Sequence, residues 1–163
     1  MPIWMGDEVV LWHGTTLSAA LQLAEEGPNL ALSRQALDFG RGFYVTTREH
    51  RAVDWAWRQA ENKHEPPAIL RWAIAVDDFR KWPMMAFADA GHSADLFWEF
   101  VRFNRTKKRH HRPNGWFDVV MGPASSNFRG RIAYGDLDQL SVHTDDGIAC
   151  LMSVQPEVFE VAP

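Results

Sequence analysis

The spacing of apolar residues alternates along the chain between a period of two and a period of three to four, which predicts short strands separated by helices. Strands are expected where β-branched and aromatic residues gather, and helices where apolar residues recur at helical spacing. Because strands dominate and helices are inserted between them, the pattern favours the α+β class over an alternating parallel α/β fold. Strands are predicted at 9–12, 42–46, 69–76, 116–122, 139–143 and 158–161, and helices at 17–26, 48–62, 95–105 and 145–152.

Small polar residues mark where these elements begin. Thr15 or Thr16 is expected to cap the first helix, and Thr144 to cap the last one, because a hydroxyl can accept a bond from an N–H of the first turn. Residues 28–41 and 123–138 show no clear period and are predicted to be loops.

The composition fits one domain spanning residues 1–163. Apolar residues make up 46% of the chain, enough for a sizeable core, and the net charge of −4 gives no general nucleic-acid-binding surface. Cys150 is the single cysteine, so no disulfide can form within the chain, which suits a reducing cytoplasm. We see no secretory signal and no apolar run near the roughly 20 residues that cross a bilayer. A cytoplasmic protein without membrane attachment is therefore expected.

Two short motifs are candidates for a site. His13-Gly14-Thr15 lies where the first strand is predicted to end, and Gly40-Arg41-Gly42 precedes an aromatic strand. Each has a structural explanation, namely a histidine held by local hydrogen bonds and a turn or bulge that needs glycine. The second motif lacks the third glycine of a dinucleotide fingerprint and the Gly-Lys-Ser/Thr of a P-loop. The functional alternative is a ligand that lies against the glycine backbone.

Taken together, the two motifs resemble the ADP-ribosyltransferase fold, in the histidine-tyrosine-glutamate branch that includes the poly(ADP-ribose) polymerases. That branch has His-Gly-Ser/Thr on one strand, Gly-Lys-Gly-Ile-Tyr-Phe on the next, and a second tyrosine eleven residues after the first. Here the eleventh residue after Tyr44 is Trp55, another flat aromatic. The segments "DFGRGFYVTT", "FDVVMGPAS" and "DQLSVHT" also resemble a family of small bacterial domains with a DFGxGFY motif, formerly of unknown function and placed in the same fold.

The resemblance covers residues 9 to about 152 and implies an ADP-ribosyltransferase-like split β-sheet core with inserted helices. It also implies that NAD is the substrate. No metal site is expected, because the adjacent His110 and His111 point in different directions and no cysteine or acidic residue lies at ligand spacing from them. His13 would hold the adenine-side ribose, and the backbone of Gly14 would bind the nicotinamide carboxamide. Thr15, the last residue of this motif, is expected to bind NAD together with Gly14.

The same resemblance assigns the two aromatic walls of the nicotinamide site. Tyr44 would stack on one face of the ring and Trp55 would close the other, while Gly42 would leave room beside the strand. Two aromatic faces around a cationic pyridinium offer a cation–π attraction of roughly 0.5 to 2 kcal/mol. The alternative is that Tyr44 and Trp55 are core aromatics.

The third position of the branch departs from its pattern. A glutamate normally begins a late strand there and bonds the ribose beside the breaking bond, and Gln139 takes its place in "DQLSVHT". Glutamine can still bond a hydroxyl, but it offers no full negative charge to an oxocarbenium-like transition state. Asp136 or Asp138 is the candidate to supply the missing carboxylate, and the alternative is that these acids are simply solvated.

A basic segment holds six of the 17 positive charges within residues 102–112. Cations near a helix C-terminus are favourable, so a solvated helix end is one explanation. The other is a patch that contacts the phosphates of RNA, DNA or NAD. The residues assigned to nucleic-acid binding are Arg105, Lys107, Lys108 and Arg109.

These observations predict an NAD-dependent mono-ADP-ribosyltransferase in which His13, Tyr44 and Gln139 are catalytic. Small members of this fold often act as toxins in toxin–antitoxin or phage-defence systems, so the resemblance implies a toxin or defence effector with a macromolecular acceptor and an antitoxin partner. The basic segment at 102–112 favours RNA or DNA over protein as that acceptor. One alternative is a catalytically weak or inactive module of the same fold that binds NAD, ADP-ribose or RNA. Another is a toxin ribonuclease with His110 or His111 as general base.

Overall fold

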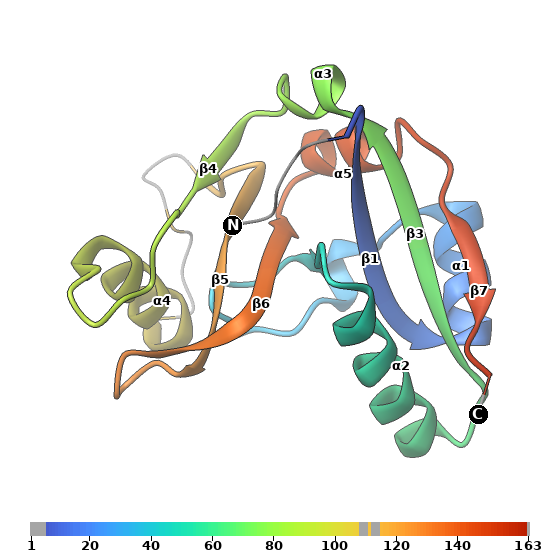
Figure 1. Ribbon diagram of the computed structural model, residues 1–163, viewed down its shortest axis with the longest axis horizontal. Coiled ribbons are helices and arrows are strands. Elements are labelled where there is room, and N and C mark those ends of the chain that lie inside the picture. The colour runs from blue at the N-terminus through green and yellow to red at the C-terminus, as the bar shows by residue number, and fades with distance from the viewer. Residues whose placement is uncertain (1–5, 108–110, 112–114, 163) are drawn as a thin grey trace. The chain divides into compact units, whose positions relative to one another are not determined.

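The computed structural model describes residues 6–107, 111 and 115–162. The described residues form five α-helices, one 3-10 turn and seven strands in two sheets, which confirms the predicted α+β class. The chain divides into two compact units, each built on a sheet of its own (Figure 1). Unit 1 comprises Met1–Pro28, Val45–Trp82 and Ala149–Pro163, and unit 2 comprises Asn29–Tyr44 and Pro83–Ile148.

The helices and strands are divided between the two units. Unit 1 contains β1 (Glu8–Thr16), α1 (Leu17–Glu26), α2 (Glu49–Lys63), β3 (Pro67–Ala75), α3 (Val76–Phe79) and β7 (Glu157–Glu160). Unit 2 contains the 3-10 turn η1 (Leu30–Leu32), β4 (Met84–Ala86), α4 (Asp95–Lys107), β5 (Val119–Asn127) and β6 (Ile132–Val142). The boundary between the units falls within β2 (Phe43–Val45) and within α5 (Asp145–Leu151).

The sheet of unit 1 has the order β1-β3-β7, and both pairings are antiparallel. In the view of Figure 1, α2 lies in front of this sheet and α1 behind it. Residues opposite each other in register share a face, so Leu11 and Trp72 lie together on one face and are fully buried. On the other face, Trp12 and Ile69 pack with alanines of α2.

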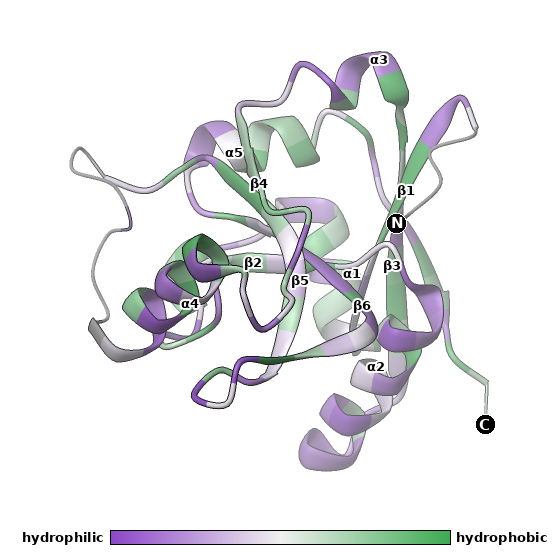
Figure 2. Ribbon diagram, turned by 60° about the vertical axis from the view of Figure 1, so that its left-hand side comes forward, coloured by the Kyte–Doolittle hydropathy of each residue, from purple (hydrophilic) through white to green (hydrophobic). Residues whose placement is uncertain are grey.

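Helix α2 approaches β1 unusually closely, because the residues at the contact are small. Its buried residues are alanines at a spacing of four, Ala52, Ala56 and Ala60. A Cβ added at Gly14 would lie 1.9 Å from the carbonyl oxygen of Ala52 and 2.8 Å from the backbone nitrogen of Ala56. The rest of the helix is largely hydrophilic (Figure 2), so α2 depends on this narrow alanine stripe for its attachment.

The sheet of unit 2 has the order β2-β6-β5-β4, with β4 parallel to β5 and β5 antiparallel to β6. Its core cluster joins the glycine loop, α4 and β5 through Phe39, Phe97, Trp98, Val101 and Val120. Phe39 and Phe97 meet edge to face, with ring centroids 6.4 Å apart. This packing places the segment before β2 against helix α4.

The prediction of a loop at 123–138 was wrong. Residues 119–127 and 132–142 are the two strands of a hairpin, with register shifts between Pro123 and Ser125 and between Ser125 and Asn127. Small and polar residues occupy these strands because much of the hairpin is solvent-exposed and the shifts interrupt the alternation that marks a strand. The strand predicted at 116–122 begins only at Val119, and α3 and β4 were not predicted.

The helix signals were correct in position but not in every bond. Thr16 occupies the N-cap of α1 and Gly27 ends that helix with φ of 78°, but the Thr16 hydroxyl makes no capping hydrogen bond, so that part of the prediction was wrong. The hydroxyl of Thr144 accepts a 3.1 Å hydrogen bond from the N–H of Gly147 at the start of α5. Within the described ranges, no helix combines the length and the apolar character that crossing a membrane requires.

The contact between Gly14 and α2 predicts that Gly14→Ala lowers the free energy of unfolding by about 1–3 kcal/mol, because the new methyl meets rigid backbone. Urea denaturation measures this change. The matched control is Gly135→Ala, since no atom lies within 4 Å of a Cβ added there. Equal stability of the two variants would contradict the close approach.

Candidate functional site

The outer edge of β1 carries the His-Gly-Thr motif. Trp12 exchanges two backbone hydrogen bonds with Thr46, of 2.7 and 2.9 Å, on the side of β1 away from β3. Backbone groups of a strand alternate with a period of two, so the N–H and C=O of Gly14 point to the same outer edge as those of Trp12. The N–H donor and C=O acceptor of Gly14 therefore point away from β3 at the end of this bridge, and the residue itself is buried.

The two side chains of the motif, those of His13 and Thr15, lie on the same face of β1. His13 pairs in register with Leu70 and is half-buried on the face opposite α2. Thr15 pairs with Ala68 on that same face and is buried. Gly14 alone of the three faces α2, so the motif combines a backbone group at the edge with a half-buried imidazole.

Trp55 lies on α2 directly before Ala56, whose backbone nitrogen is near Gly14. Its side chain is 45% exposed. The alternative that Trp55 is a core aromatic is therefore wrong, and unit 1 holds an accessible indole next in sequence to a residue that contacts the Gly14 position.

Tyr44 fixes the glycine loop of unit 2. Its hydroxyl donates a 2.7 Å bond to the carbonyl of Gly40 and accepts a 3.1 Å bond from the N–H of Phe39. Its ring stacks on that of Phe39, with centroids 6.4 Å apart and planes 20° from parallel. Burial raises the pKa of the Tyr44 phenol above its ordinary value, so the hydroxyl stays protonated. Tyr44 also packs against the core cluster of unit 2, so the alternative that it is a core aromatic is confirmed for this residue.

The two glycines of this loop are required by packing within unit 2. Gly40 has a φ of 85°, and a Cβ there would lie 2.5 Å from the Trp116 ring. A Cβ at Gly42 would lie 2.7 Å from Nδ1 of His143. Protein atoms therefore fill the space beside Gly40 and Gly42 in which a ligand was expected. A contact of Gly42 with NAD stays a prediction.

Asp38 is a site residue that sequence reasoning missed. Its carboxylate is 4% exposed and accepts 2.7 Å bonds from Nε of Arg105 and from the N–H of Ser125. The Ser125 hydroxyl also donates to it, at 2.5 Å, and the guanidinium of Arg105 completes an ion pair at 2.6 Å. The available signal was an acidic residue between Leu37 and Phe39, immediately before the glycine loop.

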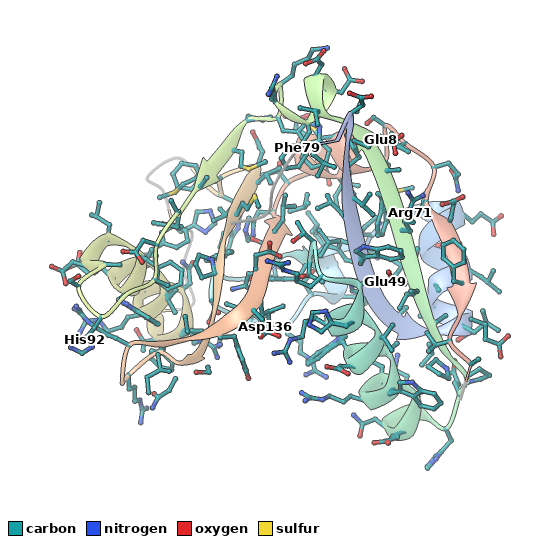
Figure 3. The ribbon with its side chains drawn as sticks, viewed as in Figure 1. Glu8, Glu49, Arg71, Phe79, His92 and Asp136 are labelled. Carbon is teal, nitrogen blue, oxygen red and sulfur yellow. The ribbon has the colours of Figure 1, made fainter. Side chains whose placement is uncertain are left out.

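Gln139 belongs to the same group. Its Nε2 donates to Oδ2 of Asp38 at 2.8 Å and to the carbonyl of Pro123 at 3.2 Å. Asp136, one of the carboxylates near Gln139 in sequence, lies exposed on β6 (Figure 3). Unit 2 therefore joins Gln139 to a carboxylate, and that carboxylate is Asp38.

His143 is a buried imidazole beside the glycine loop. The carbonyl of Arg41 can only accept, so Nδ1 of His143 carries the proton and donates to it at 2.7 Å. Nε2 accepts from the hydroxyl of Ser141, also at 2.7 Å, and Trp116 stacks on the ring. Burial lowers the pKa of His143 to about 4, so the ring is neutral at neutral pH. Because Ser141 is fully buried, this Ser–His pair is structural.

The basic segment is described only in part. Arg105 lies in the ion pair with Asp38, which explains it without a nucleic acid. The side chain of Lys107 and all of Lys108, Arg109 and His110 lie outside the described residues. Nε2 of His111 accepts a hydrogen bond from the N–H of Phe117, and Nδ1 is hydrogen-bonded to the carbonyl of Phe39. Both ring nitrogens are therefore bonded to the backbone.

The comparison with protein families decides the family. A family model described as "Protein of unknown function (DUF3990)" matches residues 9–134, more than half of the chain. The chain belongs to the DUF3990 family. The matched segment includes both glycine motifs and Asp38, and it ends before Gln139 and His143. No match to a curated protein was found.

In this DUF3990 chain, the lowered pKa of His143 predicts a loss of stability in acid. The neutral ring is favoured in the folded state, so its contribution is complete above about pH 6.5 and disappears as the pH falls towards 4. At about 1.4 kcal/mol per pH unit, the loss is on the order of 3 kcal/mol. Urea denaturation between pH 7 and 4 should show a shallower pH dependence for His143→Gln. His92→Gln is the control, because His92 is exposed, and its unfolding free energy should depend on pH as in the wild type. The same pH dependence in His143→Gln would contradict a buried neutral His143.

A second prediction for the DUF3990 chain concerns the Tyr44 hydroxyl. Tyr44→Phe keeps the ring but leaves an N–H and a carbonyl of the glycine loop without their partner, which should cost about 1–3 kcal/mol of unfolding free energy. The other tyrosine, Tyr134, is 44% exposed, and Tyr134→Phe should change stability by less than about 0.5 kcal/mol. Similar melting temperatures for the two variants would exclude the anchoring role.

Proposed function

We propose that this chain is an NAD-dependent mono-ADP-ribosyltransferase of ADP-ribosyltransferase-like split-sheet fold that acts in the cytoplasm. The reaction breaks the bond between C1′ of the ribose and the nicotinamide nitrogen. The nitrogen keeps the bonding electron pair, so nicotinamide leaves neutral. An acceptor nucleophile forms the new bond to C1′ from the opposite face and gives up its proton.

The edge of β1 is the observation that carries the proposal. A nicotinamide carboxamide needs one acceptor for its NH₂ and one donor for its oxygen. The backbone of Gly14 offers both at an edge, on a strand held by the bridge between Trp12 and Thr46. That bridge joins the strand of the His-Gly-Thr motif to the segment that directly follows Tyr44.

The exposed indole of Trp55 supports a site for a cationic ring. An accessible tryptophan on a largely hydrophilic helix, next to a residue packed at Gly14, suits a cation–π contact with the pyridinium. In the proposal Tyr44 supplies the second aromatic face and His13 binds the adenine-side ribose.

Gln139 has a modest part in this proposal. A ring that loses nicotinamide develops positive charge at C1′, and a fixed negative group beside it would be the strongest stabiliser. Gln139 offers a neutral carbonyl oxygen, so we expect single, slow transfer in place of chain elongation. A nucleic-acid acceptor remains our preference over protein because positive charges gather in residues 102–112, and an antitoxin would restrain the activity.

A non-catalytic module that binds NAD, ADP-ribose or RNA is the second candidate. The observation that favours it is the bonding of Gln139 to Asp38 and Pro123, because the amide nitrogen is then held by the protein.

A labelling experiment separates the two candidates. The chain is incubated with cell lysate and with NAD labelled in its adenylate part, and the products are digested separately with ribonuclease, deoxyribonuclease and protease. Transfer predicts labelled macromolecules and released nicotinamide, whereas the module predicts neither.

Trp55→Ala is the sharpest test of the aromatic site, because Tyr44 also holds its own loop and its removal would disturb the fold. We expect at least a tenfold loss of nicotinamide release, with the melting temperature unchanged, and partial recovery in Trp55→Phe. Phe159→Ala is the control, since Phe159 is an aromatic of similar exposure, 43%, on β7. Full activity in Trp55→Ala would refute the aromatic clamp.

A further inference from the structure

The Asp38 carboxylate is a buried acceptor whose two oxygens are both in use. Oδ1 accepts from Arg105 and from the Ser125 hydroxyl, and Oδ2 accepts from the N–H of Ser125 and from Nε2 of Gln139. These donors come from α4, β5 and β6, while Asp38 comes from the loop before β2. A charge that is almost fully buried is tolerable only with such partners.

This arrangement settles which way the Gln139 amide points. An ionised carboxylate and a backbone carbonyl can only accept, and the amide group of Gln139 faces one of each, Asp38 and Pro123. The group directed at them must therefore be NH₂. The carbonyl oxygen of Gln139 is left on the other side of the amide, so it can offer only an acceptor.

We infer that Asp38 is a positioning residue that acts through Gln139. It holds the amide with its nitrogen inward, so that position 139 meets a ligand with an oxygen that accepts from a hydroxyl or N–H. It also selects glutamine over glutamate at this position. The assignment of that ligand as the ribose of NAD rests on the proposed function, whereas the contact between Asp38 and Gln139 does not.

Electrostatics explains why glutamate does not suit position 139. A carboxylate there would face Asp38 at the 2.8 Å that now separates a donor from an acceptor, and it would also face the carbonyl of Pro123. Arg105 is the cation paired with Asp38 and would serve two anions. Two such close carboxylates cannot both remain ionised at low cost, so one would take up a proton.

A double-mutant cycle on unfolding tests the contact directly. Gln139→Glu should lower the urea midpoint at pH 7, and this deficit should shrink at pH 5, where the carboxylate pair binds a proton more readily. Asp38→Asn alone should also lower the midpoint, because an amide would face the donors of Ser125 and Gln139. In the Gln139→Glu background Asp38→Asn should cost less, since its NH₂ can donate to the new carboxylate at position 139.

Gln35→Glu is the control for this cycle, because it makes the same charge change at an exposed position and should leave the midpoint unchanged. Additive effects of Asp38→Asn and Gln139→Glu, or a deficit of Gln139→Glu that does not depend on pH, would overturn the inference. The cycle needs no activity, so it decides the contact even if the chain does not turn over NAD.

Nicotinamide release tests whether Asp38 acts through Gln139 in the reaction. Below the unfolding transition, Asp38→Asn and Gln139→Met should each lower the release rate about tenfold. The release rate of the double variant should be no lower than that of the slower single variant, because the effects of residues that act as a unit are not additive. A further tenfold loss in the double variant would overturn the positioning role, and no release by the wild type would refute only the proposed function.

Discussion

The buried charge of Asp38 is the constraint on which unit 2 depends. The loop before β2, helix α4 and the β5–β6 hairpin are far apart in sequence, and each contributes a group to this carboxylate. Removing Arg105 would leave the Asp38 carboxylate out of water, which costs about 3–5 kcal/mol in a fully buried pair and less here, because the Arg105 side chain is 30% exposed. Phe39 follows Asp38 directly and belongs to the core cluster. The hydrogen bonds of Asp38 and the core packing of Phe39 therefore stabilise the same loop, and the loss of one should weaken the other.

Unit 1 is held by a different constraint, which is proximity. The alanine stripe of α2 lies so close to β1 that only a glycine fits at position 14. Close backbone contact replaces the large side chains that usually attach a helix to a sheet, and it leaves the remaining faces of α2 free to carry charged residues and the exposed Trp55. The attachment of the helix and the accessibility of its indole thus follow from the same choice of small residues.

The sequence predicted elements where one strong local signal fixes them. Helices α1, α2 and α4 lie close to their expected positions because apolar residues recur at helical spacing over ten or more residues. The β5–β6 hairpin was missed because small and polar residues on an exposed, irregular hairpin carry no such signal. Local patterns also could not reveal that Asp38 reaches Ser125 and Gln139, since these partners are 87 and 101 residues away. The sequence therefore revealed the two glycine motifs of the candidate site, but it did not reveal the side chains that pack against them.

The packing at Gly14, Gly40 and Gly42 changes how the glycine motifs can be read across relatives. Each position is closed to a side chain by neighbouring protein atoms, so selection for folding alone would preserve it. A descendant that lacked the proposed activity would still keep these three glycines. Position 55, whose side chain is 45% exposed, is not restrained in this way. If Trp55 contacts the ligand as proposed, drift at that single tryptophan among chains that keep every glycine would therefore mark the lineages that do not carry out the proposed reaction.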